Sequence, residues 1–95
     1  MTTKTVDFNK SGIAQLPDDQ PALYEVQTEG GCTNYAGIAQ RGRLQERLRE
    51  HLPGAKDALP GAKVRIRTMP SIDEARAAEA RAIARLQPKY NKQGK

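Results

Sequence analysis

Six side chains that can move a proton, contact a phosphate or hold a metal ion are spread along this chain: Tyr24, Tyr35, Arg47, His51, Glu79 and Asn91. A carboxylate can bind a divalent cation, and an arginine can neutralise a phosphate. A phenol or an imidazole can take up a proton. Together these groups suit metal-assisted cleavage of a phosphodiester bond, although each of them alone also suits a structural role.

Glu79 is the most unusual of the six because it falls on an apolar helical face. The segment 71–86 has helical periodicity and begins with a Ser-x-x-Glu capping pattern. Its apolar positions lie three, four or seven residues from Glu79 and are Ile72, Ala75, Ala82, Ile83 and Leu86. Burying an unpaired carboxylate costs on the order of several kcal/mol. We therefore expect a partner for Glu79, which could be a metal ion, a tyrosine hydroxyl or an arginine such as Arg47.

Tyr24 and Tyr35 are expected on the two strands of a hairpin, because residues 22–27 and 32–38 alternate around a turn. A four-residue turn would place Tyr24 opposite Tyr35, and a two-residue turn would place it opposite Gly37. Either turn leaves both phenols on one face, because an even turn preserves the parity of the strands. The two rings could handle a proton or could form a cross-strand contact worth under about 1 kcal/mol.

Arg47 and His51 are four residues apart on a helix predicted for residues 43–52, so they share one face. An arginine beside a histidine suits an anionic, phosphate-like group, although a solvated basic edge is the plainer reading. The apolar face of this helix would consist of Leu44, Leu48 and Leu52.

The remaining elements complete an α+β domain. Residues 1–16 read as a polar lead-in with one short helical turn, and residues 17–21 read as a turn. Residues 63–69 alternate as a third strand, which Pro70 ends. The resulting order is β-β-α-β-α, which predicts a small three-stranded antiparallel sheet flanked by helices.

Composition points to one domain with an anionic partner. The 95 residues carry 16 basic and 11 acidic side chains, a net charge of +5, which favours nucleic acid. A single cysteine, Cys32, allows no internal disulfide and suits a reducing compartment, so we expect a cytoplasmic protein. No apolar run is long enough for a signal peptide or a membrane span. One histidine and one cysteine also argue against a zinc site.

The order of these residues resembles the GIY-YIG nuclease family. Ala22-Leu23-Tyr24 and Tyr35-Ala36-Gly37 stand where its two name-giving motifs would be, and residues 44–51 look like its helix with an arginine and a following histidine. Glu79 and the segment Pro88-Lys89-Tyr90-Asn91 are similar to its metal-binding glutamate and closing Tyr-Asn pair. The resemblance covers residues 17–92 of a single domain spanning the chain.

The resemblance implies a DNA endonuclease that uses one Mg2+ or Mn2+ ion bound by Glu79. Tyr24 would be the general base or would position the nucleophile, and Tyr35 and Arg47 would hold the phosphate. His51 would assist proton transfer or contact the phosphate. Further roles would be bracing of the site by Asn91 and contacts to nucleic acid by Arg41 and Arg43. Glu79 should then point at the sheet face that bears Tyr24 and Tyr35.

The chain also departs from the family pattern. Ala22 replaces a glycine, Ala36 replaces a bulky aliphatic residue, and Tyr35 and Arg47 are two residues further apart than is common. Arg43 is therefore an alternative for the phosphate-binding arginine. Two other functions stay open at this stage: a non-catalytic nucleic-acid-binding module on the same fold, and a protein-interaction adaptor in which Glu79 forms a structural ion pair.

Overall fold

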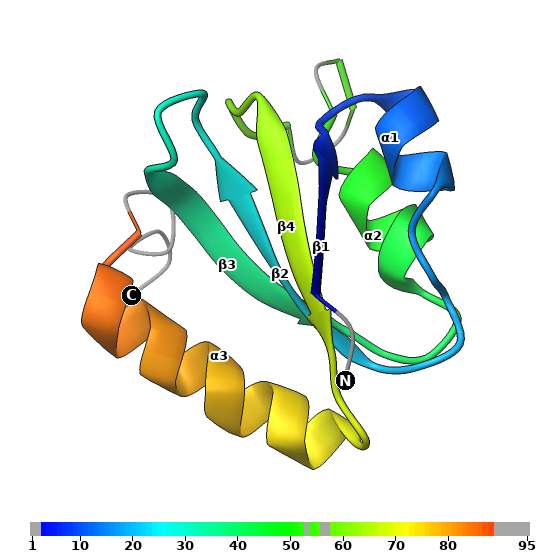
Figure 1. The fold of residues 1–95 in the computed structure, drawn as a ribbon, viewed down its shortest axis with the longest axis vertical. Coiled ribbons are helices and arrows are strands. Elements are labelled where there is room, and N and C mark those ends of the chain that lie inside the picture. Colours follow the sequence, from blue (N-terminus) through cyan, green and yellow to red (C-terminus); the bar gives the residue numbers. More distant parts are fainter. Residues whose placement is uncertain (1–2, 53, 56–57, 89–95) are drawn as a thin grey trace.

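A computed structural model describes residues 3–52, 54–55 and 58–88, which form an antiparallel sheet with helices on both faces (Figure 1). In chain order the elements are β1 (Thr3–Asp7), α1 (Lys10–Ala14), β2 (Ala22–Gln27), β3 (Thr33–Ala39), α2 (Leu44–Arg49), β4 (Lys63–Thr68) and α3 (Ile72–Leu86). The strand order across the sheet is β1-β4-β2-β3. None of the helices in this described part is long and apolar enough to cross a membrane.

The sheet has four strands, so the predicted count of three is wrong. The additional strand is β1, which pairs antiparallel with β4 from Thr3 opposite Arg67 to Asp7 opposite Lys63. Only Val6 of this edge strand is buried, so its sequence carries almost no alternating apolar signal. The helical turn expected in the same segment is α1, where the Asn9 side chain accepts a hydrogen bond from the Gly12 amide at 2.7 Å.

The hairpin of β2 and β3 has a register that places Tyr24 opposite Gly37, the second of the two expected arrangements. Val26 pairs with Tyr35, but Gln27 pairs with Thr33, so β3 has one extra residue at this point. The loop between Gln27 and Thr33 has an odd number of residues, which alone would put the two tyrosines on opposite faces. The extra residue of the β-bulge reverses this effect. The two tyrosines consequently share a face, although the predicted four-residue turn is not the one that forms.

The two faces of the sheet are covered by different helices. On one face, Tyr24 and Val26 pack with Leu44 and Leu48 of α2, and Tyr35 packs against this cluster. On the other face, the buried alanines of α3 contact side chains of β2, β3 and the segment after β4. That second cluster consists of Leu23, Ala36, Met69, Ala75, Ala78 and Ala82. The tyrosines and α3 therefore lie on opposite faces.

Helix α3 starts where its sequence predicts, because the Ser71 hydroxyl accepts a hydrogen bond from the Glu74 amide at 3.2 Å. Its buried stripe is centred on Ala78, and Glu79 is half-buried beside that stripe. Leu86 is 39 % exposed, so its assignment to the buried face is wrong.

Candidate active site

The site is centred on a hydrogen bond between the Tyr24 hydroxyl and Nε2 of His51, which are 3.1 Å apart. Tyr24 comes from the middle of β2 and is fully buried, and His51 is 5 % exposed. A phenol and an imidazole at this distance can exchange a proton. Both residues are site residues predicted from the sequence, but their hydrogen bond to each other is not predicted.

His51 follows α2 rather than lying in it, because the helix ends at Arg49 and is shorter than the predicted 43–52. The His51 amide donates to the Leu48 carbonyl at 3.0 Å, which tightens the chain into a turn of the 3₁₀ type. The His51 carbonyl accepts a hydrogen bond from the Leu59 amide at 2.9 Å. These two bonds fix the backbone on both sides of the ring.

The rings of Tyr24, Tyr35 and His51 form one cluster on the face of the sheet that α2 covers. The ring centroids of Tyr24 and Tyr35 are 6.1 Å apart, and those of Tyr35 and His51 are 5.2 Å apart. The phenol of Tyr24 lies over Gly37, where an added Cβ would be only 2.7 Å from the hydroxyl oxygen. Glycine at position 37 therefore provides the space that Tyr24 occupies.

Burial raises the pKa of Tyr24 above the ordinary tyrosine value of 10.0, and the neighbouring Tyr35 raises it further. Arg47 acts in the opposite direction through its charge and a hydrogen bond to the phenol. Glu79 adds a smaller upward contribution. The same proximity to Tyr24 raises the pKa of the Arg47 guanidinium. At neutral pH the phenol therefore retains its proton beside a permanently charged arginine.

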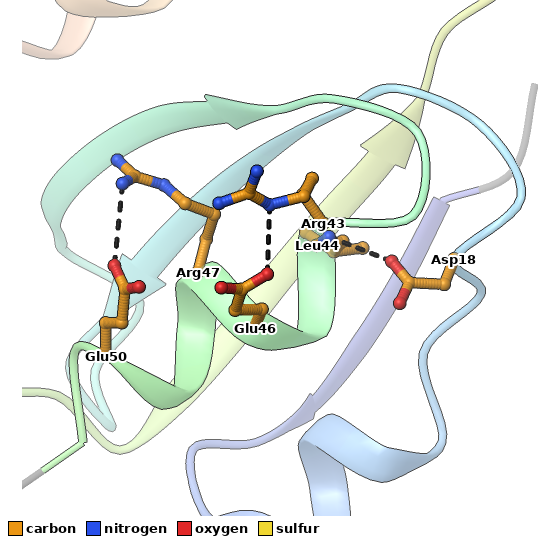
Figure 2. A network of polar contacts seen from close by, with 6 residues as sticks. All are labelled: Asp18, Arg43, Leu44, Glu46, Arg47 and Glu50. Atoms are coloured by element: carbon orange, nitrogen blue, oxygen red, sulfur yellow. Dashed lines mark hydrogen bonds and ion pairs between the residues drawn. The ribbon is translucent and has the colours of Figure 1, made fainter.

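The position of α2, and with it that of Arg47, depends on Asp18 in the turn before β2 (Figure 2). The Arg43 side chain makes no capping bond at the helix start, and Asp18 Oδ1 instead accepts a hydrogen bond from the Leu44 amide at 2.8 Å. The Asp18 carbonyl also accepts from the Gly42 amide at 2.9 Å. This cap was not predicted, because Asp18 and Leu44 are far apart in the sequence.

Two ion pairs run along α2 and are drawn in Figure 2. Nε of Arg43 is 2.9 Å from Oε1 of Glu46, and Nη1 of Arg47 is 3.5 Å from Oε1 of Glu50. The first pair is exposed, and such pairs contribute at most about 1 kcal/mol. Arg43 can thus exchange its carboxylate for an incoming anion at little cost.

A hollow of about 300 Å³ lies beside this cluster, at the end of β3 between α2 and α3. Its lining includes three arginines: Arg43 just before α2, Arg47 on α2 and Arg76 on α3. We call this hollow the arginine cleft. The other lining residues are Ile38, Ala39, Gln40 and Ile72. Arg76 was not predicted as a site residue, although it lies one helical turn before Glu79.

Glu79 is on the helix that covers the opposite face of the sheet, which differs from the expectation that α3 faces the tyrosines. The two faces meet at β3, because β3 is an edge strand and the arginine cleft is lined from both α2 and α3. Glu79 is half-buried, and its charge acts on the Tyr24 hydroxyl. The site thus draws on both sides of this edge.

The other predicted site residues are placed as follows. Arg41 and Arg43 are exposed just before α2, and Arg43 lines the cleft whereas Arg41 is not among its lining residues. Asn91 and the preceding Tyr90 lie outside the described residues.

The donor set suits a hydrated metal ion rather than a protein cage. Within residues 3–52, 54–55 and 58–88, no three His, Cys, Asp or Glu side chains are grouped so that they could hold a metal. Mg2+ commonly keeps several waters and binds through one or two carboxylates together with substrate phosphates. A single half-buried Glu79 beside an arginine-lined cleft that can take a phosphate fits that mode of binding.

Neither a protein-family model nor a curated protein matches the sequence. Solved structures do match the fold. The GIY-YIG N-terminal endonuclease domain of UvrC from Thermotoga maritima, bound to its catalytic divalent cation magnesium, is 26% identical with a TM-score of 0.65. The match covers 85% of this chain and 92% of that domain. This chain resembles the GIY-YIG nucleases in structure as well as in sequence.

A point mutant of the same UvrC domain, also bound to its catalytic divalent cation, is 27% identical over 85% of this chain and 91% of its own, with the same TM-score of 0.65. The GIY-YIG resemblance predicted from the order of residues is therefore confirmed. The alanines at positions 22 and 36, which depart from the family pattern, are both fully buried in the sheet. They are compatible with the GIY-YIG fold.

Proposed function

We propose that this chain is a metal-dependent endonuclease that hydrolyses phosphodiester bonds in DNA. The observation that carries the proposal is the buried hydrogen bond between Tyr24 and His51, next to the Arg47 guanidinium. Such a bond links a nucleophile-activating phenol to a proton acceptor, and an arginine beside it can hold the phosphate under attack. The solved UvrC domains that match the fold carry a catalytic divalent cation, which supports a metal-assisted reaction.

In this proposal Tyr24 and His51 act together as the base. Burial raises the pKa of Tyr24, so the phenol alone is a poor acceptor at neutral pH. With neutral His51, the Tyr24 hydroxyl donates its proton to Nε2 while its oxygen takes a proton from the attacking water. The water oxygen then bonds to phosphorus and the bond to the leaving oxygen breaks. Arg47 stabilises the phenol oxygen and the phosphate during this transfer.

The arginine cleft binds the scissile phosphate in this proposal. Guanidinium groups bind phosphate oxygens in a bidentate way, and the cleft offers those of Arg43, Arg47 and Arg76. Tyr35 lies against His51 and contributes its hydroxyl to the same phosphate. Arg43 and Arg47 then both bind the phosphate, whereas the sequence left open which of the two does so.

Glu79 would hold the single Mg2+ or Mn2+ ion. When bound, such an ion polarises the phosphate and stabilises the charge of the leaving oxygen. The three arginines of the neighbouring cleft repel a free cation, and a bound phosphate cancels part of that repulsion. We therefore expect Mg2+ to bind weakly to the free protein and more tightly in the presence of DNA.

Supercoiled plasmid nicking tests the proposal. The protein should nick the plasmid with Mg2+ and should stop when EDTA removes the metal. Tyr24→Phe keeps the ring but removes the bond to His51, so the nicking rate should fall by about 100-fold or more. A wild-type rate in Tyr24→Phe would refute the role assigned to this bond.

The basic charge of the chain also suits a non-catalytic DNA-binding module, which is the second candidate function. Such a module would bind DNA in a salt-sensitive way without nicking it under any metal condition. A protein-interaction adaptor would show neither activity. The same nicking assay, run beside a DNA-binding titration, separates the three functions.

A further inference from the structure

A second arginine-rich surface lies on the other side of α3 from the arginine cleft. It consists of Arg65 and Arg67 on β4 and Arg81 and Arg85 on α3, all of which are exposed. Two hollows of about 150 and 480 Å³ separate β4 from α3 here. Arg67 and Arg85 line both hollows, so the four side chains belong to one continuous region. We call it the β4–α3 surface.

The geometry of the two elements explains why this surface is separate. Arg65 and Arg67 alternate with the buried Val64 and Ile66, so they project from the face on which α3 packs. Among the described elements, helix α3 packs mainly against β3 and β2 (Figure 1), and the two hollows lie on its β4 side. Arg81 and Arg85 of α3 line one of these hollows together with Arg67 of β4.

The helical phase separates the two arginine regions. At 100° per residue, Arg81 points about 160° away from Glu79. Arg76 lies only about 60° from Glu79, on the side of the arginine cleft. The side of α3 that faces the candidate site is therefore distinct from the side that carries Arg81 and Arg85.

The charges of the β4–α3 surface are not neutralised within the described part of the chain. No carboxylate there forms an ion pair with any of its four arginines, whereas Arg43, Arg47 and Lys63 each have one. Among the described residues, the one carboxylate that lines these hollows is that of Glu25, which is 6 % exposed. Its Oε1 accepts hydrogen bonds from Gln27 Nε2 at 3.4 Å and Thr33 Oγ1 at 3.5 Å, toward the hairpin end of the strand.

We infer that the β4–α3 surface binds backbone phosphates of DNA at a distance from the phosphate that is cleaved. The identity of the polyanion rests on the proposed function. Exposed arginines without carboxylate partners match a chain of phosphates in charge, and guanidinium groups bind phosphate in a bidentate way. Contacts of this kind position the duplex and carry no base specificity. DNA would then be held on both sides of α3.

The test compares two double variants that have the same net charge. Arg67→Gln/Arg85→Gln removes the two residues shared by both hollows, and Lys10→Gln/Arg49→Gln removes two exposed cations elsewhere. Arg49 points about 160° away from Arg47 on α2 and so lies off the candidate site. Binding to a short DNA duplex is measured by fluorescence anisotropy in EDTA over a range of NaCl concentrations.

The first double variant should bind roughly tenfold more weakly, and the slope of log K against log salt should fall by about two. The second should stay within about twofold of the wild type. Equal weakening of both variants, or no weakening of the first, would overturn the inference, because general charge would then account for binding. The binding measurements are made without metal and so do not depend on cleavage. Absence of nicking would therefore refute the proposed function without affecting the β4–α3 surface. Unchanged DNA binding by Arg67→Gln/Arg85→Gln would refute the β4–α3 surface without affecting the proposed function.

Discussion

At the scale of single residues, Tyr24 depends on a neighbour that has no side chain. A Cβ at position 37 would lie 2.7 Å from the Tyr24 hydroxyl oxygen and 2.9 Å from Cε2 of Tyr35. Gly37→Ala should therefore displace both rings, destabilise the fold by about 1–3 kcal/mol and lower the nicking rate. The control is Gly30→Ala, whose added Cβ would meet its nearest atom at 3.9 Å.

Chemical denaturation and the nicking assay measure these two effects on each variant. A Gly37→Ala protein as stable and as active as Gly30→Ala would show that Tyr24 does not need its observed position.

The titration of Tyr24 gives a pH-dependent prediction. Its pKa is raised in the folded protein by burial, above the value of 10.0 for an exposed tyrosine. The unfolded chain therefore loses this proton first as the pH rises through about 10, and the free energy of unfolding falls by up to about 1.4 kcal/mol per pH unit there. Urea denaturation at pH 8 and pH 11 measures the change.

Tyr24→Phe should show a smaller loss of stability between these two pH values than the wild type. Tyr35→Phe is the comparison variant, since that ring belongs to the same cluster. If all three proteins lose the same stability at high pH, ionisation of Tyr24 plays no part in alkaline unfolding.

At the scale of elements, α2 is held by a cap that comes from another part of the chain. Asp18 Oδ1 accepts from the Leu44 amide, so Asp18→Ala should destabilise the protein by about 1 kcal/mol and shift the helix that carries Arg47. The adjacent, exposed Asp19 provides the control Asp19→Ala. Thermal unfolding should separate the two variants, and identical midpoints would contradict the capping role.

Local patterns predicted the elements that alternate or repeat strongly. The hairpin strands, β4 and α3 follow from apolar periodicity, and the start of α3 follows from Ser71. Strand β1 could not be predicted in the same way, because only Val6 of it is buried. The helix end at Arg49 was also missed, since Leu52 continues the apolar period beyond the last helical hydrogen bond.

The tertiary parts of the site were harder to predict. A β-bulge decides that Tyr24 lies opposite Gly37, and no residue pattern in the turn specifies it. The face of the sheet that α3 covers depends on how the chain crosses after β4, which periodicity does not describe. For this reason the sequence selected Glu79 and Tyr24 as site residues but placed them on the same face. Arg76 and Asp18 matter only through contacts between distant elements.

At the scale of the whole molecule, helix α3 divides the basic charge into two regions. The arginine cleft lies at the β3 edge, and the β4–α3 surface lies between β4 and α3. Seven arginines thus lie where a polyanion could contact both sides of one helix. In the proposed function, the first region holds the phosphate that reacts and the second positions the duplex.

The central claim is that Glu79 and the Tyr24–His51 pair form one metal-dependent site across the edge of β3. The most direct test is the Mg2+ dependence of plasmid nicking by Glu79→Gln, with Glu29→Gln at the exposed hairpin turn as the matched control. We predict that Glu79→Gln remains folded and loses nicking at every Mg2+ concentration, whereas Glu29→Gln follows the wild-type curve. Wild-type nicking by Glu79→Gln, with the same Mg2+ dependence, would contradict the account.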